Sequence, residues 1–153
     1  MNSFVARFGA TALLGTALAT VPMAAQGQEF INVLTGGTSG VYYPLGVALS
    51  EIYADGIEGA RVQVQATKAS VENLNLLAQE RGEIAFSLGD AVALAWEGVE
   101  EAGYPRPLTE LRAIAAIYPN YIQIVADAAS GIETLEDVPG KSMSVGAPAS
   151  GTE

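Results

Sequence analysis

The chain has 153 residues, of which 50% are apolar and 16% are charged, and its formal net charge is −10. This composition is typical of a globular protein, and the acidic excess argues against nucleic-acid binding because no basic patch can neutralise phosphates. The sequence has no cysteine and no histidine, which excludes disulfides, thiolate or histidine-rich metal sites, and Ser-His or Cys-His catalysis in these residues. We therefore expect neither a metal nor a cofactor.

The first 27 residues have the three-part pattern of a secretory signal peptide. Arg7 gives the short N-terminal region its positive charge, Gly9–Val21 is small and apolar, and small residues allow cleavage after Ala25 or after Gly27. A buried amphipathic helix is the alternative, but this stretch has no polar face. We expect a periplasmic protein without a lipid anchor, because no cysteine follows the leader. No later apolar run reaches the length of about 18 residues that a membrane span needs.

Strands and helices alternate after the leader. Residues 30–35 and 62–66 have the composition and alternation of β-strands. Between them, apolar residues recur at helical spacing from Leu45 to Tyr53, and Asp55-Gly56 is expected to end that helix.

A second strand–helix pair follows. We expect Ser70 to cap a helix, residues 84–88 to form a third strand, and Asp90 to cap a third helix. Phe86 and Trp96 are expected in the core.

The remaining residues contain three further β-prone segments. Residues 111–118 and 121–126 are apolar runs separated by Pro119-Asn120, and residues 142–145 predict another strand. The alternation of strand, turn and helix predicts an α/β fold with an open, mostly parallel sheet.

Four segments lie where a predicted strand ends and a helix begins: 36–40, 67–73, 89–90 and 147–152. Ligands of open α/β sheets bind at such ends, where unpaired N–H groups and the helix dipole favour an anion. The first segment, G-G-T-S-G, is neither a dinucleotide motif nor a P-loop. Each segment also has a structural interpretation as a tight turn or a helix cap. Residues 118–121 are likewise either a hinge between lobes or a plain turn.

The sequence resembles the TAXI family in four motifs that occur in the expected order: T-G-G-T-S-G-V-Y-Y-P-L-G, A-T-K-A-S-V-E-N-L, L-R-A-I-A-A-I-Y-P and K-S-M-S-V-G-A-P-A-S-G-T-E. These proteins are the extracytoplasmic solute receptors of TRAP-type (tripartite ATP-independent periplasmic) transporters. The resemblance implies a type II periplasmic-binding-protein-like α/β fold, in which two lobes with open, mostly parallel sheets close on a ligand. It implies a small organic anion, a dicarboxylate or an acidic amino acid, as ligand, and a TRAP-type membrane permease as partner.

The resemblance also implies which residues bind the ligand. They are Thr38, Ser39, Gly40, Tyr43, Thr67, Ser70, Asn73, Asp90, Tyr118, Ala147, Ser150, Gly151 and Thr152. One departure is Ser39, which stands in a loop where the family commonly has a further glycine. Because such receptors are longer, we expect residues 28–117 to form lobe I, and residues 118–153 to be a hinge and the start of a truncated lobe II.

We thus expect a monomeric transport receptor and not an enzyme. The alternative is a periplasmic ligand-binding sensor domain, and the sequence separates the two only weakly. A hydrolase or transferase needs a nucleophile with a base beside it. Histidine and cysteine are absent, and a lysine or carboxylate base in the expected missing half is the alternative that stays open.

Overall fold

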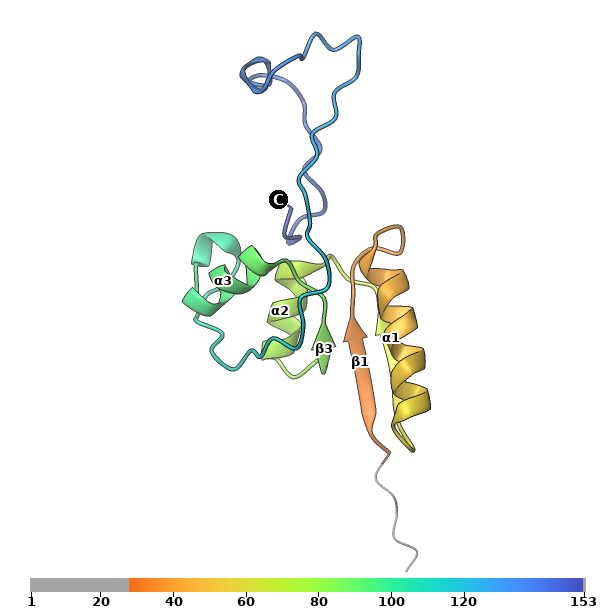
Figure 1. The fold of residues 1–153 in the computed structure, drawn as a ribbon. Coiled ribbons are helices and arrows are strands. Elements are labelled where there is room, and N and C mark those ends of the chain that lie inside the picture. The colour runs from red at the N-terminus through yellow and green to blue at the C-terminus, as the bar shows by residue number, and fades with distance from the viewer. Residues whose placement is uncertain (1–27, 153) are drawn as a thin grey trace, which may run out of the picture.

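Three strands form one parallel sheet with β1 at its centre. The computed structural model describes residues 28–152, so the expected signal peptide lies outside the described residues (Figure 1). β1 (Phe30–Leu34) pairs along its length with β2 (Arg61–Gln65), and its last two residues pair with β3 (Ile84–Ala85). The strand order is β2-β1-β3 and both pairings are parallel. The predicted α/β class with parallel strands is therefore confirmed for this part of the chain.

Helices connect and cover the strands. They are α1 (Tyr42–Gly56), α2 (Ser70–Ala78) and α3 (Gly89–Glu97), followed by two short 3₁₀ helices, η1 (Glu100–Ala102) and η2 (Leu135–Asp137). α1 links β1 to its neighbour β2, and α2 links β2 to β3 on the other side of β1; parallel strands require such crossover connections. Figure 1 shows α1 on one side of the sheet and α2 and α3 on the other. No helix among residues 28–152 is both long and apolar enough to cross a bilayer.

The core has one cluster on each side of the sheet. Ile31, Val33 and Phe86 are buried against α1, and the predicted core position of Phe86 is confirmed. The second cluster joins α2, α3 and the segment after η1 through Leu74, Ala91, Ala95, Tyr104 and Leu108.

α1 packs closely on the sheet at Gly46. A Cβ added there would lie 2.4 Å from Thr35 Cγ2 and 3.3 Å from Val64 Cγ1. Only glycine therefore allows this helix to approach the ends of β1 and β2, and this contact fixes where α1 begins relative to the sheet.

The predicted core position of Trp96 is wrong. Its side chain is 48% exposed, because the face of α3 that packs inward is defined by Ala91 and Ala95, four residues apart. Trp96 follows Ala95 directly and is turned about 100° away from that face.

The predicted caps of α2 and α3 are also wrong. Ala69 and Leu88 occupy the two N-cap positions, and neither helix has a side-chain cap. The Ser70 hydroxyl instead accepts a hydrogen bond from the Leu88 N–H at 3.1 Å. The Asp90 carboxylate accepts a hydrogen bond from the next N–H, that of Ala91, at 2.7 Å. β3 is also shorter than predicted. The Phe86 carbonyl and the Leu88 N–H form hydrogen bonds with the side chains of Asn73 and Ser70 in α2 instead of with a neighbouring strand.

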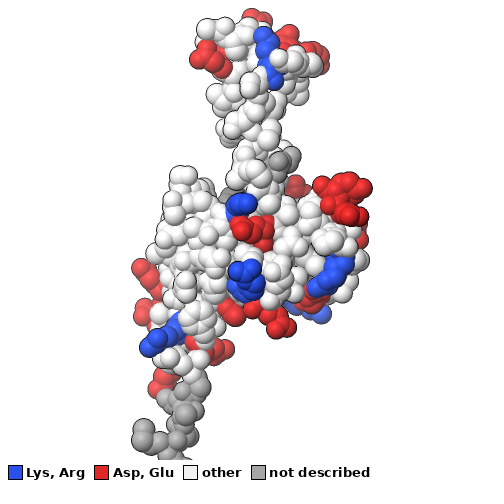
Figure 2. All heavy atoms as spheres, turned by 180° about the vertical axis from the view of Figure 1, so that it is seen from behind, with Lys and Arg blue, Asp and Glu red and all other residues white. Residues whose placement is uncertain are grey.

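Beyond Leu111 the chain leaves the packed unit. Residues 28–111 are called the body from here on, and residues 112–152 the arm. The arm extends away from the sheet as a narrow neck that ends in a small knob (Figures 1 and 2). Figure 2 shows charged side chains over the body and the knob, whereas the neck is white.

The predicted strands in the arm do not form. Residues 111–118, 121–126 and 142–145 have no strand assignment, and among the described residues no backbone hydrogen bond pairs residues 113–126 with a neighbouring segment. A strand requires a hydrogen-bonded neighbour and a surface on which to bury its apolar face. Neither exists for these segments within residues 28–152, so their β-propensity is not expressed.

The knob is ordered by local polar contacts. The Asp137 carboxylate accepts hydrogen bonds from the N–H groups of Glu133 (3.1 Å) and Thr134 (2.9 Å). These donors hold the pKa of Asp137 below its ordinary value and fix the start of η2 as a capping box does.

Candidate functional site

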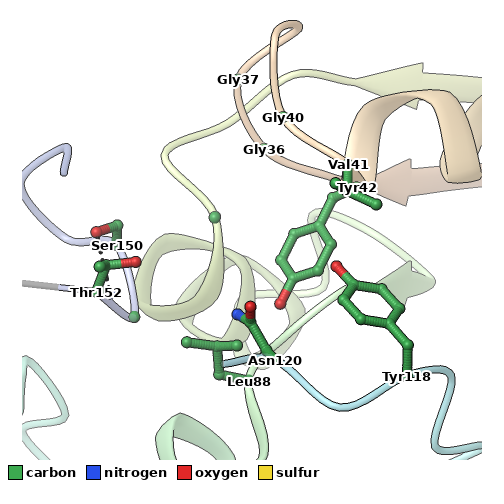
Figure 3. A pocket seen from close by; sticks show the side chains of 12 residues that line it. Gly36, Gly37, Gly40, Val41, Tyr42, Leu88, Tyr118, Asn120, Ser150 and Thr152 are labelled. Atoms are coloured by element: carbon green, nitrogen blue, oxygen red, sulfur yellow. Dashed lines mark hydrogen bonds between the residues drawn. The ribbon is translucent and has the colours of Figure 1, made fainter. Parts of the chain in front are cut away.

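A cavity lies where the three strands end and the arm begins. Its volume is about 290 Å³, close to the lower limit of about 300 Å³ for small-molecule pockets. Twelve residues line it (Figure 3): Gly36, Gly37, Gly40, Val41, Tyr42, Ala69, Leu88, Tyr118, Asn120, Ser150, Gly151 and Thr152. They come from the loops after β1 and β2, the residue before α3, the start of the arm and its last loop. The cavity thus occupies the position at which open α/β sheets bind ligands.

The loop after β1 exposes its backbone to the cavity. It is closed by a turn in which the Gly40 N–H donates to the Gly37 carbonyl at 2.9 Å. A Cβ added at Gly37 would meet no atom within 4 Å. The missing side chain therefore leaves open space in which a ligand can reach the main chain.

The Asn73 side chain ties the strand ends together beneath the cavity. It is fully buried, and its amide donates to the carbonyls of Thr35 at 2.6 Å and Phe86 at 2.8 Å. Its oxygen accepts from the Thr67 hydroxyl at 2.6 Å. One side chain of α2 therefore holds the ends of β1 and β3 and the loop after β2 in a fixed arrangement.

Ala69 reaches the cavity through a strained backbone. Its φ of 76° and ψ of −142° lie in a region that glycine occupies far more readily than alanine. The Thr67 hydroxyl accepts from the Ala69 N–H at 3.0 Å, and the Ala69 carbonyl accepts from the Asn73 N–H at 2.9 Å. These bonds hold the conformation that turns the chain from β2 into α2 at the wall of the cavity.

Two tyrosine side chains point into the cavity from different parts of the chain. Tyr42, the first residue of α1, stacks on Phe86 with 5.4 Å between ring centroids and 24° between ring planes. Tyr118 comes from the arm, and Figure 3 shows its hydroxyl directed toward the ring of Tyr42. Burial, and then the neighbouring Tyr118, raise the pKa of the Tyr42 phenol, and a hydrogen bond with Ser70 acts to lower it. Tyr42 is therefore a neutral hydrogen-bond donor at physiological pH.

The last loop of the arm returns to the body at the same place. The Glu72 N–H donates to the Ala149 carbonyl at 3.2 Å. A Cβ added to Gly151 would lie 2.7 Å from Ser70 Oγ and 2.8 Å from Leu88 Cδ1. Glycine at this position therefore allows the loop that carries Ser150 and Thr152 to pack against the start of α2.

Residues 33–153 match the NMT1-like family, a family of periplasmic binding-protein-like domains. The chain belongs to this family. The match begins near the end of β1 and includes β2, β3, the three α-helices and the arm, and it supports a ligand-binding function for this chain.

Five of the predicted site residues line the cavity of this NMT1-like protein. They are Gly40, Tyr118, Ser150, Gly151 and Thr152. Two of the four segments singled out in the sequence, 36–40 and 147–152, therefore contribute to one cavity, and Figure 3 shows both loops beside it.

The other predicted residues do not line the cavity. Thr38 and Ser39 are exposed in the turn, and Tyr43, Asp90 and Ala147 lie outside the lining. Thr67, Ser70 and Asn73 are engaged in hydrogen bonds that shape the cavity from behind. In the described structure these three are scaffold residues.

Sequence reasoning missed other lining residues of the NMT1-like chain. Tyr42 stands beside the predicted Tyr43, and Asn120 stands in the same Y-P-N-Y motif as Tyr118. Adjacent positions at a helix start point in directions about 100° apart, so only the helix rotation decides which tyrosine faces the cavity. Ala69 and Leu88 carry no chemical signal and were not identifiable.

The chemistry of the lining is neutral and rich in hydrogen-bonding groups. The twelve residues include three hydroxyl types and one amide side chain, and none of them is charged. Residues 28–152 contain no group of three or more acidic side chains arranged to hold a metal ion. The arrangement can hold a small molecule through hydroxyl, amide and backbone donors.

Proposed function

We propose that this NMT1-like protein is a periplasmic solute receptor of a TRAP-type secondary transporter, and that it binds a small organic anion between two lobes. The anion is a dicarboxylate or an acidic amino acid, and the protein acts by reversible binding without catalysis. The observation that carries this proposal is the cavity at the carboxyl ends of β1, β2 and β3, in a chain of a periplasmic binding-protein-like family.

Helix polarity supports an anionic ligand. α1, α2 and α3 all begin at or near the cavity, with Tyr42 and Ala69 in its wall and Leu88 just before α3. Each helix start presents N–H groups and the positive end of a dipole. The hydroxyls of Ser150 and Thr152 add neutral donors, so a carboxylate is stabilised without a lysine or an arginine in the lining.

The apolar surface of the arm supports a second lobe. Ile122 is 87% exposed and Val125 is 90% exposed, and contiguous exposed apolar residues mark surfaces that pack against something else. In this proposal a second lobe covers them and completes the cavity wall, the leader directs export, and the closed receptor meets a membrane permease.

Thermal unfolding with added ligand tests the proposal. The chain as encoded, without its leader, is heated alone and with the neutralised sodium salts of succinate, L-malate, L-aspartate and L-glutamate. A ligand at 100 times its dissociation constant stabilises the folded state by about 2.7 kcal/mol, which raises the melting temperature by several degrees. Sodium chloride at equal ionic strength controls for salt, and succinamide controls for the charge of the ligand.

The controls separate this function from others. Stabilisation by one of the acids, with none by succinamide, supports an anion receptor. A response to sugars or to amines in the same assay, with none to any acid, contradicts it. Turnover of the bound acid, followed by proton NMR, would show an enzyme instead of a receptor.

A further inference from the structure

We propose that the Tyr42 phenol is the principal side-chain donor to the ligand, that Ser70 orients it from behind, and that Tyr118 donates to the same ligand from the arm. This inference rests on the proposed function. It differs from the sequence-based prediction, which placed Ser70 and Tyr43 in contact with the ligand.

The Tyr42 ring is held in one orientation. It stacks on the buried Phe86 with ring centroids 5.4 Å apart, and it is only partly exposed. Its backbone belongs to the first turn of α1, which Gly46 allows to pack closely on the sheet. Because both the ring and the backbone of Tyr42 are held in place, the side chain loses little conformational entropy when it binds a ligand, and this favours affinity.

The hydrogen bonds behind Tyr42 leave its proton free for the ligand. The Leu88 N–H donates to Ser70 Oγ at 3.1 Å. The Ser70 hydroxyl is also hydrogen-bonded to Tyr42, and because Ser70 accepts from Leu88 it still has its own proton to donate to the phenol oxygen. In this proposal, donation runs from Leu88 to Ser70 to Tyr42. The phenol O–H is the end of this chain, and Figure 3 shows it directed into the cavity.

Tyr118 supplies the second donor from across the cavity. Its side chain is 41% exposed, it lines the cavity, and it lies close enough to Tyr42 to affect that phenol electrostatically. Two hydroxyls that converge from different segments match the two oxygens of one carboxylate. A bound carboxylate would therefore join α1 in the body to the start of the arm.

Hydroxyl deletions test these roles. The assay is isothermal titration with succinate or L-glutamate, whichever stabilises the wild-type chain more. Tyr42→Phe keeps the ring on Phe86 and removes only the donor, so we expect affinity to fall at least about tenfold, as for a hydrogen bond to a charged group. Tyr118→Phe should weaken binding about tenfold. Tyr43→Phe is the matched control, because Tyr43 is adjacent and does not line the cavity; its affinity should stay within about twofold of the wild type.

A double-mutant cycle tests the positioning role of Ser70. Ser70→Ala should weaken binding in the wild-type chain and have little further effect in the Tyr42→Phe background. A purely structural effect of Ser70 would lower affinity equally in both backgrounds, because its bond to the Leu88 N–H is lost in both. Equal effects would overturn the positioning role.

The outcomes separate this inference from the proposed function. Wild-type binding of an acid combined with unchanged affinity in Tyr42→Phe overturns the assignment of Tyr42 and leaves the receptor function standing. A wild-type chain that binds none of the acids overturns both. Circular dichroism and urea unfolding of each variant show that any loss of affinity occurs in a folded protein.

Discussion

The body and the arm contain equally β-prone apolar sequence, yet only the body uses it to form a sheet. Val33 in β1 is fully buried between two paired strands. Val125 lies in an apolar run of the arm and is 90% exposed. The intrinsic preference is the same, so the difference comes from neighbours: β1 has a strand on either side and a helix over it. β-propensity therefore measures how well a side chain fits a packed surface.

The body and the arm form different sides of the cavity. Its floor belongs to the body, where Asn73 ties strand ends together. Its open side belongs to the arm, which contributes Tyr118, Asn120 and the loop of Ser150 to Thr152. Changes at scaffold residues such as Asn73 are therefore expected to alter stability, and changes at the lining residues of the arm to alter binding with little effect on stability.

The largest effect is expected for Asn73→Ala. The change removes three hydrogen bonds and leaves the Phe86 carbonyl buried without its partner, so we expect the free energy of unfolding to fall by about 3–4 kcal/mol. Asn75→Ala is the matched control from the same helix. Asn75 is only partly buried, and its loss should cost about 1 kcal/mol. Equal midpoints for the two variants in urea unfolding would contradict the role of Asn73.

An alkaline loss of stability is expected from Tyr104. Burial, and then the Asp90 carboxylate, raise the pKa of Tyr104 to about 12, whereas an unfolded tyrosine ionises at about 10. The folded state retains the proton longer, so this stabilisation is complete below about pH 10 and is lost as the pH rises through about 12. Between about pH 10 and pH 12, the free energy of unfolding in urea should fall by about 2 kcal/mol more for the wild type than for Tyr104→Phe.

The same variant has a second expected result at neutral pH. The Tyr104 hydroxyl is buried and has no hydrogen-bond partner among the described residues. Tyr104→Phe removes this uncompensated polar group, so the variant should be at least as stable as the wild type at pH 7. Tyr121→Phe changes an exposed ring of the arm and should alter neither result. A clear destabilisation by Tyr104→Phe at pH 7 would contradict the inference about its hydroxyl.

A smaller, stabilising effect is expected for Ala69→Gly. Glycine adopts φ and ψ values of 76° and −142° without the strain that alanine carries, so the free energy of unfolding should rise by about 1 kcal/mol. Ala93→Gly makes the same change in the middle of α3 and should lower it by about 1 kcal/mol. Thermal unfolding of both variants measures the difference in sign. A loss in both would show that Ala69 is not strained.

The smallest effect is expected in the arm. Val125→Thr should change the free energy of unfolding by no more than about 0.5 kcal/mol, because the side chain is 90% exposed. Val33→Thr places the same hydroxyl in the core and should cost about 1–2 kcal/mol. If the two variants lose the same stability, then the exposed neck contributes to the folded unit, and the division into body and arm is wrong.

Local pattern was sufficient for the elements of the body. The β-prone run that became β1, the alternation of β2 and the helical spacing after Pro44 each predicted the observed element to within a few residues. These signals work because each element forms with its sequence neighbours in a βαβ unit. The caps predicted at Ser70 and Asp90 were wrong. Ala69 and Leu88 occupy the two N-cap positions, and the Ser70 hydroxyl accepts instead from the Leu88 N–H, which is distant in sequence.

The candidate site was predictable by position and only partly by residue. The rule that ligands bind beyond the carboxyl ends of parallel strands selected loops that line the cavity, and the family resemblance included Tyr118 and Ser150, which lie in its lining. The choice of Tyr42 over Tyr43 depends on the rotation of α1, which Gly46 and the stacking on Phe86 determine. That rotation is a property of packing between distant segments.

The sequence by itself determined the α/β class, the order of elements in the body and the loops that carry the cavity, because periodicity and turn residues act locally along the chain. The tertiary structure alone decided that Asn73 is a scaffold residue, that Tyr42 faces the cavity, and that residues 113–126 form no strand pair among the described residues. The physical reason is the same in each case. A side chain's role depends on which partner atoms lie within a few ångströms, and those partners come from elsewhere in the chain.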